Sequence, residues 1–195
     1  MKILGLTGSV GMGKSTAAKM LRSMGVPVYD ADAAVHRMMS RGGIAVAKVA
    51  AAFPGVEHAG AIDRAALGKR VFGDEPAMKR LEAIIHPLVR EDEKAFLAAH
   101  RRRKTRLVVM DVPLLFESGR DKRYDATMVL TAPAFLQRDR VLARPGMNAA
   151  RFAAILARQM PDVEKRKRAD FIVPSGLGRA VTRRSLRAVL RKLAP

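Results

Sequence analysis

Residues 8–15 are the part of the sequence whose residue types most clearly suit chemistry. They read GSVGMGKS and match the pattern Gly-x-x-x-x-Gly-Lys-Ser/Thr, directly after a short apolar run and before residues with helical spacing. Glycines let such a loop curl so that its backbone N–H groups, with the amino end of the next helix, point at phosphate oxygens. The pattern predicts a phosphate-binding loop (P-loop); a Gly-rich turn with a chance Lys-Ser pair is the alternative.

Side chains in this loop and directly after it are of the types that bind ATP and Mg²⁺. Lys14 is expected to contact the β- and γ-phosphates, and Ser15 to place its hydroxyl on Mg²⁺. Thr16 is expected to lie close to the α-phosphate. The other predicted nucleotide contacts come from the loop backbone at Gly11, Met12 and Gly13.

Two carboxylates follow apolar runs that read as strands. Asp111 ends the run 107–110, and Asp32 comes shortly after the run 26–29. Ligands of open α/β sheets bind at the carboxyl ends of the strands. Asp111 is therefore a candidate for holding Mg²⁺, directly or through water, and Asp32 for orienting an acceptor hydroxyl and taking its proton. A capping or loop role is the alternative for Asp111, and a helix N-cap for Asp32.

The apolar pattern also predicts the elements that position these groups. Strands are expected at residues 3–6, 26–29, 107–110, 126–130 and 171–173. Helices are expected at residues 14–24, 33–39, 44–53, 64–71, 76–100, 133–143, 148–160 and 179–193, with Asp63 and Asn148 as caps and a bend or division at His86-Pro87. Strands that alternate with helices predict a mostly parallel sheet with helices on both faces.

Length and composition limit the classes of protein that need considering. A chain of 195 residues with 49% hydrophobic content favours one domain with insertions. No secretory signal or apolar stretch long enough to cross a bilayer is evident, so we expect a soluble, cytoplasmic protein. The absence of cysteine excludes disulfides and thiolate metal sites.

The net charge of +19 suits a polyanionic partner, either nucleic acid or a phosphorylated nucleotide. Only 5% of the residues are aromatic, and no nucleic-acid-binding module is recognised, which counts against nucleic acid. We expect the basic runs to be mainly solvated faces.

Beyond the P-loop, an ordered series of segments resembles the dephospho-CoA kinase family over essentially the whole chain. The segments are residues 6–8 with the P-loop, then 29–32, 63–67 with 71–72, 81–87, 111–117, Arg140 and Arg144, 159–161 with Lys165, and 169–171. The P-loop alone identifies a superfamily, whereas the ordered set is specific to one family. The turn at 173–176 lacks the Asn that many relatives carry, and Arg144-Pro145-Gly146 replaces a more usual Arg-Asp.

The resemblance implies a fold and an activity. The fold is a P-loop NTPase three-layer α/β/α domain over residues 1–195, with a helical acceptor-binding insertion at about 33–100 and a helical lid at about 137–165. The activity is transfer of the ATP γ-phosphate to the ribose 3′-hydroxyl of dephospho-CoA, the final step of coenzyme A synthesis. A monomer or weak homo-oligomer is expected.

The resemblance also assigns acceptor-side residues. It makes Asp32 the base for the acceptor hydroxyl and puts Arg64 and His86 in the acceptor-binding region. The planar guanidinium of Arg64 suits a pyrophosphate, with a surface ion pair as the alternative. His86 either bonds the acceptor or fixes a helix break.

On the nucleotide side, the spacing of Arg140 and Arg144 predicts one helical face, and the resemblance places both in the lid over the phosphates. Solvated helix positions are the alternative for both. Lys165 matches a family position near the adenine, or belongs to an exposed basic run. Glu117 either orients neighbouring basic groups or makes an ordinary cap or salt bridge.

Two other functions compete with this reading. One is a kinase for another small acceptor, such as a nucleoside monophosphate or shikimate, against which segments 81–87 and 111–115 argue. The other is an NTP-dependent nucleic-acid-binding protein, favoured by the charge and the basic carboxyl-terminal helix.

Overall fold

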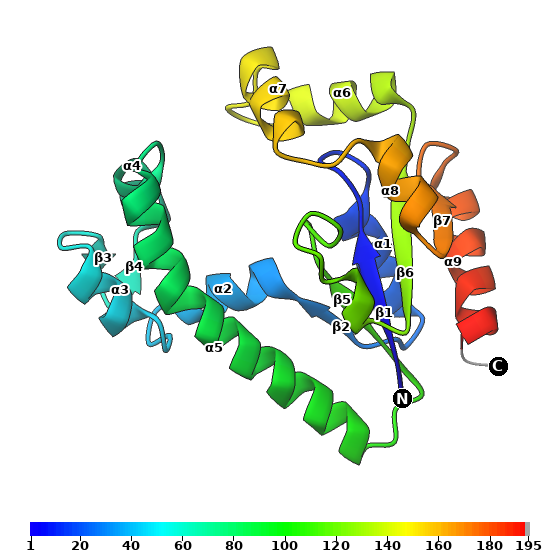
Figure 1. The fold of residues 1–195 in the computed structure, drawn as a ribbon, viewed down its shortest axis with the longest axis horizontal. Helices are drawn as coiled ribbons and strands as arrows, with labels where there is room; N and C mark the ends of the chain where they lie inside the picture. The colour runs from blue at the N-terminus through cyan, green and yellow to red at the C-terminus, as the bar shows by residue number, and fades with distance from the viewer. Residues whose placement is uncertain (194–195) are drawn as a thin grey trace. The chain divides into compact units, whose positions relative to one another are not determined.

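The computed structural model describes residues 1–193, which form two compact units (Figure 1). The sheet unit contains Met1–Tyr29 and the chain from Arg101 onward, and the helical unit contains Asp30–His100. Within residues 1–193, no helix combines the length and the apolar character needed to cross a membrane.

Five strands form the central sheet, and every strand pair whose register is defined runs parallel. The strands are β1 (Lys2–Thr7), β2 (Val28–Asp30), β5 (Leu107–Asp111), β6 (Ala126–Thr131) and β7 (Phe171–Pro174), in the order β2-β5-β1-β6-β7. The predicted mostly parallel sheet is confirmed. Leu6 lies opposite Asp111, so the carboxyl end of β5 is beside the start of the P-loop.

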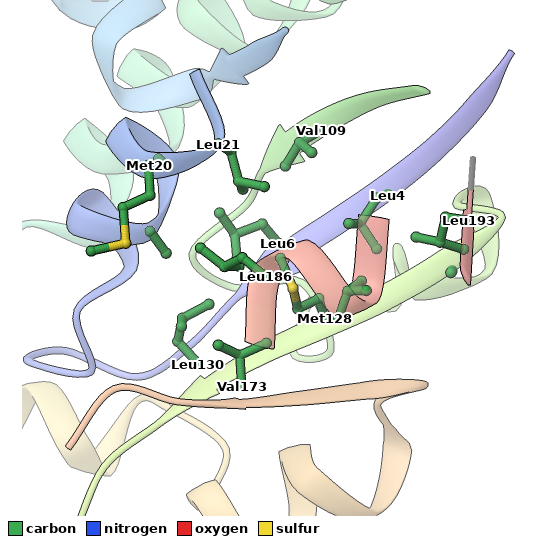
Figure 2. Close-up of a cluster of buried hydrophobic side chains, with 14 of the residues drawn as sticks. Leu4, Leu6, Met20, Leu21, Val109, Met128, Leu130, Val173, Leu186 and Leu193 are labelled. Carbon is green, nitrogen blue, oxygen red and sulfur yellow. The ribbon is translucent and has the colours of Figure 1, made fainter. Parts of the chain in front are cut away.

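Two helices cover one face of this sheet and enclose the main core (Figure 2). They are α1 (Lys14–Ser23) and α9 (Arg179–Leu193). Alternate residues of β1 point inward, and Leu4 and Leu6 are fully buried against Leu21 of α1 and Leu186 of α9. Residues 4–7 of β1 are buried in succession, which explains why the strand was readable as a short apolar run.

The other face of β1 packs against the connection between β5 and β6, which includes the short helix η1 (Asp121–Arg123). A Cβ built at Gly5 would lie 3.0 Å from Tyr124 Cδ2 and 3.1 Å from Leu115 Cδ2, so this connection approaches the strand backbone closely. Both faces of the sheet are therefore covered, as a parallel sheet requires.

Three helices separate β6 from β7, namely α6 (Ala134–Leu142), α7 (Ala149–Ala157) and α8 (Asp162–Arg168). Asn148 caps α7 as predicted, because its side chain accepts from the Arg151 N–H. The prediction that Arg140 and Arg144 share a helical face is wrong, since α6 ends at Leu142 and Arg144 lies in the following turn. The separate helix α8 was not predicted, because a seven-residue segment with six charged residues shows no apolar period.

The helical unit contains α2 (Ala31–Met39), α3 (Val46–Ala52), a two-stranded sheet of β3 (Glu57–His58) and β4 (Ala61–Ile62), α4 (Arg64–Val71) and most of α5 (Glu75–Arg102). The predicted cap at Asp63 is confirmed, since its Oδ1 accepts from the N–H groups of Ala65 and Ala66. These two bonds lower the pKa of Asp63.

The predicted cap of α2 is wrong, and of the bend or division predicted for α5 at His86-Pro87 the division is wrong. Asp30, not Asp32, caps α2, because its side chain accepts from the Ala33 N–H. The sequence offered two carboxylates two residues apart, and the residue that keeps extended backbone angles takes the capping role. Helix α5 is also not divided at Pro87, which lies within its 28 residues. A proline removes one helical hydrogen bond, and a helix of about eight turns tolerates that loss.

Removing a side chain from the core under α1 and α9 should destabilise the protein strongly. We expect Met128→Ala to lower the free energy of unfolding by about 2–5 kcal/mol, because Met128 is fully buried and its truncation leaves a cavity. Urea denaturation measures the effect. The matched control is Ile172→Ala on the neighbouring strand, where the side chain is 46% exposed and a change within about 0.5 kcal/mol is expected. Equal losses for both variants would contradict the assigned core.

Candidate active site

The P-loop (residues 8–15) joins β1 to α1 in a conformation that requires glycine at two positions. Gly11 has φ +77° and Gly13 has φ +81°, both in the left-handed region. A Cβ at Gly11 would lie 2.7 Å from Val141 Cγ2, and one at Gly13 would lie 3.2 Å from Ser175 Oγ. The loop therefore packs closely against α6 and the turn after β7.

Side chains outside the P-loop bind its carbonyl oxygens. Gln137 Nε2 donates to the Val10 oxygen at 2.8 Å, and Ser175 Oγ donates to the Met12 oxygen at 2.8 Å. Arg140 Nη1 donates to the Gly11 oxygen at 3.4 Å. The first N–H groups of α1 have no partner within the helix, so its amino end offers them to an anion.

An ion pair joins the P-loop lysine to the end of the neighbouring strand. Lys14 Nζ lies 2.5 Å from Asp111 Oδ1, and the Asp111 side chain is only 4% exposed. Thr7 Oγ1 donates to the Pro113 oxygen and so connects the same two chain segments after the strands end. The structure thus brings together Lys14, predicted to contact the phosphates, and Asp111, predicted to hold Mg²⁺.

The residues here fit a magnesium ion of the kind that accompanies a nucleotide. Within residues 1–193, no group of three or more His, Asp and Glu side chains could hold a metal by itself. Mg²⁺ at kinase sites usually takes one or two protein oxygens, with phosphates and water supplying the rest. The Ser15 hydroxyl, at the exposed start of α1, and the Asp111 carboxylate are such a pair.

The two predicted lid arginines differ in their surroundings. Arg140 is half-buried and donates to the Ser175 carbonyl oxygen at 2.8 Å and to Ser175 Oγ at 3.2 Å, besides its contact with Gly11. The alternative that Arg140 is a solvated helix residue is therefore wrong. Arg144 is exposed in the turn after α6. The structure places Arg140, but not Arg144, against the P-loop.

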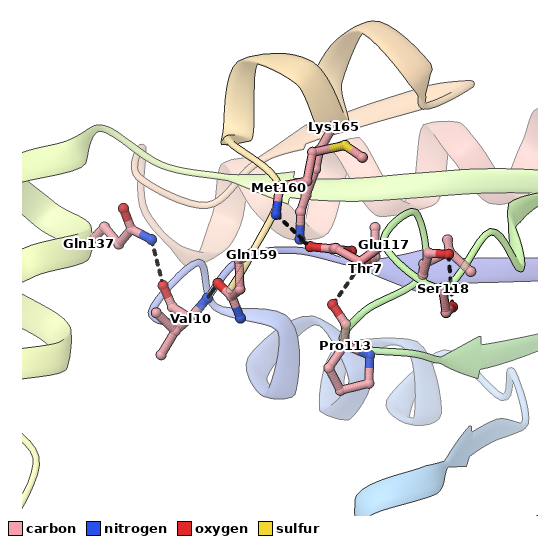
Figure 3. Close-up of polar contacts among 10 residues, drawn as sticks. Thr7, Val10, Pro113, Glu117, Ser118, Gln137, Gln159, Met160 and Lys165 are labelled. Carbon is pink, nitrogen blue, oxygen red and sulfur yellow. Dashed lines mark hydrogen bonds and ion pairs between the residues drawn. The ribbon is translucent and has the colours of Figure 1, made fainter. Parts of the chain in front are cut away.

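Lys165 is fully buried and pairs with Glu117 (Figure 3). Its Nζ lies 2.8 Å from Glu117 Oε1, which also accepts from the Met160 N–H at 2.8 Å. The alternative that Lys165 belongs to an exposed basic run is wrong, because α8 turns this one residue inward while Arg166, Lys167 and Arg168 face solvent. Glu117 makes the salt bridge that the sequence left open.

The pKa of Glu117 reflects two opposing causes. Burial acts to raise it, while the hydrogen bond and charge of Lys165, with backbone N–H groups including that of Met160, act to lower it. The lowering prevails, so the folded protein favours the carboxylate. Glu117 is therefore held as the carboxylate that contacts Lys165 Nζ.

The predicted acceptor-side residues all lie in the helical unit. Asp32 is exposed in the first turn of α2, and His86 is exposed on α5. Arg64 Nη1 lies 3.2 Å from His36 Nδ1. Arginine can only donate, so this contact requires His36 Nδ1 to accept and to carry no proton. Arg64 thus contacts a histidine in place of the carboxylate that the alternative expected, and its role toward an acceptor remains a prediction.

Sequence reasoning missed Gln137 and Ser175 and assigned no role to Gln159. Gln137 is buried within α6, where a polar residue gives no periodic signal, and Ser175 lies in the turn where the sequence showed only that an Asn was lacking. Gln159 belongs to the segment 159–161 that supports the family resemblance, but only the structure shows that its Oε1 accepts from the Val10 N–H at 3.0 Å.

A parallel sheet with a P-loop after its first strand and an acidic residue ending the adjacent strand defines a P-loop nucleotide-binding protein. The model of the family described as dephospho-CoA kinase matches residues 2–177. The chain belongs to the dephospho-CoA kinase family.

Individual relatives agree with this family. The chain is 56% identical over 193 residues to a dephospho-CoA kinase of Mesorhizobium japonicum, covering 99% of this chain and 97% of the relative. It is 67% identical over 166 residues to one of Paramagnetospirillum magneticum, covering 85% and 78%. Among solved structures, TT1252 from Thermus thermophilus superposes with a TM-score of 0.83 at 38% identity, covering 100% of this chain and 98% of that one.

Breaking the buried pair should destabilise the sheet unit in a pH-dependent way. We expect Glu117→Gln to lower the free energy of unfolding by roughly 3 kcal/mol at pH 7, because it leaves the Lys165 charge buried without its partner. Folding lowers the pKa of Glu117, so the wild-type advantage is complete above the ordinary value of 4.5 and shrinks as pH falls below it.

Denaturation of both proteins between pH 3.5 and 8 checks this expectation. The control is the double variant Glu117→Gln/Lys165→Met, which removes both charges and should recover much of the loss. A pH-independent difference, or a double variant weaker than Glu117→Gln, would count against the ion pair as the cause.

Proposed function

We propose that this protein transfers the γ-phosphoryl group of ATP to the ribose 3′-hydroxyl of dephospho-CoA, giving CoA and ADP. The observation that carries the proposal is the family match over residues 2–177, together with the Lys14–Asp111 pair at the P-loop. We further propose that it works in the cytoplasm, with Mg²⁺, as a monomer or weak homo-oligomer.

On the donor side, the P-loop binds the phosphates. Lys14 would exchange part of its interaction with Asp111 for the β- and γ-phosphate oxygens, so that the carboxylate becomes available to Mg²⁺ together with Ser15. Bound there, Mg²⁺ supplies positive charge that offsets the charge developing on the phosphates. The backbone of Gly11, Met12 and Gly13 would surround the phosphates, and Thr16 would approach the α-phosphate.

On the acceptor side, Asp32 would orient the 3′-hydroxyl and take its proton. The hydroxyl oxygen forms a bond to the γ-phosphorus while the bond from that phosphorus to the β,γ-bridging oxygen breaks, and ADP leaves with the electron pair. Asp32 is exposed and is not the cap of α2, so its carboxylate is not committed to that helix. Arg64 and His86 would bind the acceptor.

Three further side chains would complete the nucleotide site. Arg140 is already beside the Gly11 carbonyl and would stabilise charge on the transferring phosphoryl group. Arg144, in the turn after α6, would reach the phosphates when the lid closes. Lys165 would lie near the adenine, with its charge paired to Glu117.

Release of ADP tests the proposed reaction directly. With ATP·Mg²⁺ and a panel of dephospho-CoA, nucleoside monophosphates and shikimate, we expect ADP release only with dephospho-CoA, and a product heavier by one phosphoryl group. Transfer to a different acceptor would retain the P-loop kinase and reject the proposed substrate.

Replacing the proposed base should separate binding from chemistry. Asp32→Asn should retain ATP affinity within about twofold and lose at least about 100-fold in kcat, because general-base assistance typically contributes 10²–10⁴-fold. Steady-state kinetics and ATP titration measure the two effects. Asp30→Asn is the neighbouring control: the Asn side-chain oxygen can still accept from the Ala33 N–H, so the stability of α2 and kcat should both change little. Normal turnover by Asp32→Asn would remove Asp32 from the mechanism.

Replacing the P-loop lysine should affect both binding and turnover. We expect Lys14→Ala to weaken ATP binding by about tenfold or more and to lower kcat further, because the ammonium contacts phosphates whose charge changes during transfer. The variant also leaves the buried Asp111 without this partner, so thermal denaturation must show that it folds. A folded variant with unchanged kinetics would reject the P-loop interpretation.

A further inference from the structure

Two glutamine side chains from different parts of the chain form hydrogen bonds with the backbone of Val10 in the P-loop (Figure 3). Its N–H donates to Gln159 Oε1 at 3.0 Å, and its carbonyl oxygen accepts from Gln137 Nε2 at 2.8 Å. These groups belong to the two peptide planes on either side of the Val10 Cα. Two fixed planes restrain both backbone dihedrals of that residue.

The backbone group that each glutamine contacts determines whether the oxygen or the nitrogen of the side-chain amide faces Val10. An N–H group can only donate, so Gln159 must present its oxygen, and a carbonyl can only accept, so Gln137 must present its nitrogen. Gln137 is 7% exposed, and a polar group this buried is costly to leave without its partner. The two contacts therefore have opposite, chemically testable polarity.

The hydrogen bonds to the P-loop carbonyl oxygens also fix the direction of the N–H groups that would bind a phosphate. In a trans peptide the C=O and the following N–H point in opposite directions. The Gln137 contact with the Val10 oxygen therefore fixes the Gly11 N–H, and the Ser175 contact with the Met12 oxygen fixes the Gly13 N–H. The side chains behind the loop thus determine the direction of its phosphate-binding donors.

The two glutamines bracket the helical hairpin of α6 and α7. Gln137 lies in α6, Gln159 lies two residues beyond the end of α7, and the two helices pack together. The close approach of α6 to the loop is independently visible at Gly11, where an added Cβ would lie 2.9 Å from the Gln137 carbonyl oxygen. Both ends of the hairpin are therefore attached to one P-loop residue.

We propose that Gln137 and Gln159 are positioning residues that hold the P-loop in its nucleotide-binding conformation and couple it to the α6–α7 hairpin. The proposal rests on ATP being the P-loop ligand, as proposed above. When one of these two hydrogen bonds is lost, only a fraction of the molecules hold the P-loop in its binding conformation. The apparent ATP affinity then falls in proportion to that fraction.

The test compares Gln137→Glu with Gln159→Glu, which add the same charge beside the same residue. At pH 8 an ionised carboxylate accepts but cannot donate, so Gln159→Glu keeps the bond to the Val10 N–H, whereas Gln137→Glu faces the Val10 oxygen with no donor. Calorimetric titration should give an ATP Kd at least about fivefold weaker for Gln137→Glu than for Gln159→Glu. The Kd for dephospho-CoA should be unchanged in both.

A double-mutant cycle with Gln137→Met and Gln159→Met provides the second readout, because methionine keeps the length and removes the hydrogen bond. Each change should weaken ATP binding by about 3- to 10-fold, and the double variant by less than the product, since both act on one residue. Equal ATP affinity for the two Glu variants would overturn the positioning role. So would a variant that binds ATP and dephospho-CoA more weakly by the same factor. Failure of the folded wild-type protein to bind ATP would instead reject the proposed function.

Discussion

The ion pair between Lys14 and Asp111 is the interaction around which the sheet unit is arranged. It forms because β1 and β5 are adjacent and parallel, so that Lys14, at the end of the loop that follows β1, meets Asp111, the last residue of β5, at one edge of the sheet. Asp111 is almost fully buried, and a carboxylate in that position needs a cationic partner. The same edge must therefore carry a cation, which makes it suitable for a phosphate and a metal. The fold and the chemistry depend on one electrostatic constraint.

A second feature of the site is that side chains from other parts of the sheet unit restrain the P-loop. A P-loop rich in glycine has many accessible conformations, and glycine loses more backbone entropy on ordering than other residues. Here carbonyl oxygens along the loop are bound by side chains from α6 and from the turn after β7. The buried Glu117–Lys165 pair, which also holds the Met160 N–H, fixes the segment that carries Gln159. Part of the rigidity at the nucleotide site thus comes from Gln137, Gln159 and Ser175, for which no contact with the nucleotide is proposed.

Much of the fold was readable from the sequence because β1, β5 and β6 are buried strands whose sequences are continuous apolar runs, and because Asp63 and Asn148 are strong capping signals. The family was readable from an ordered set of segments, and the comparisons confirm it. Three kinds of detail were not predictable. The cap of α2 depended on a backbone angle at Asp30, the inward turn of Lys165 on a short charged helix, and the glutamine contacts on distances between residues more than 100 positions apart.

The central claim is that this site delivers a phosphoryl group to one particular hydroxyl of its acceptor. Phosphorus-31 NMR of the product formed from ATP·Mg²⁺ and dephospho-CoA tests that claim most directly, because the coupling of the new phosphorus to a ribose proton reports its position. We expect one new phosphomonoester resonance coupled to the ribose 3′ proton. A resonance coupled to the 2′ proton, or to a proton outside the ribose, would contradict it.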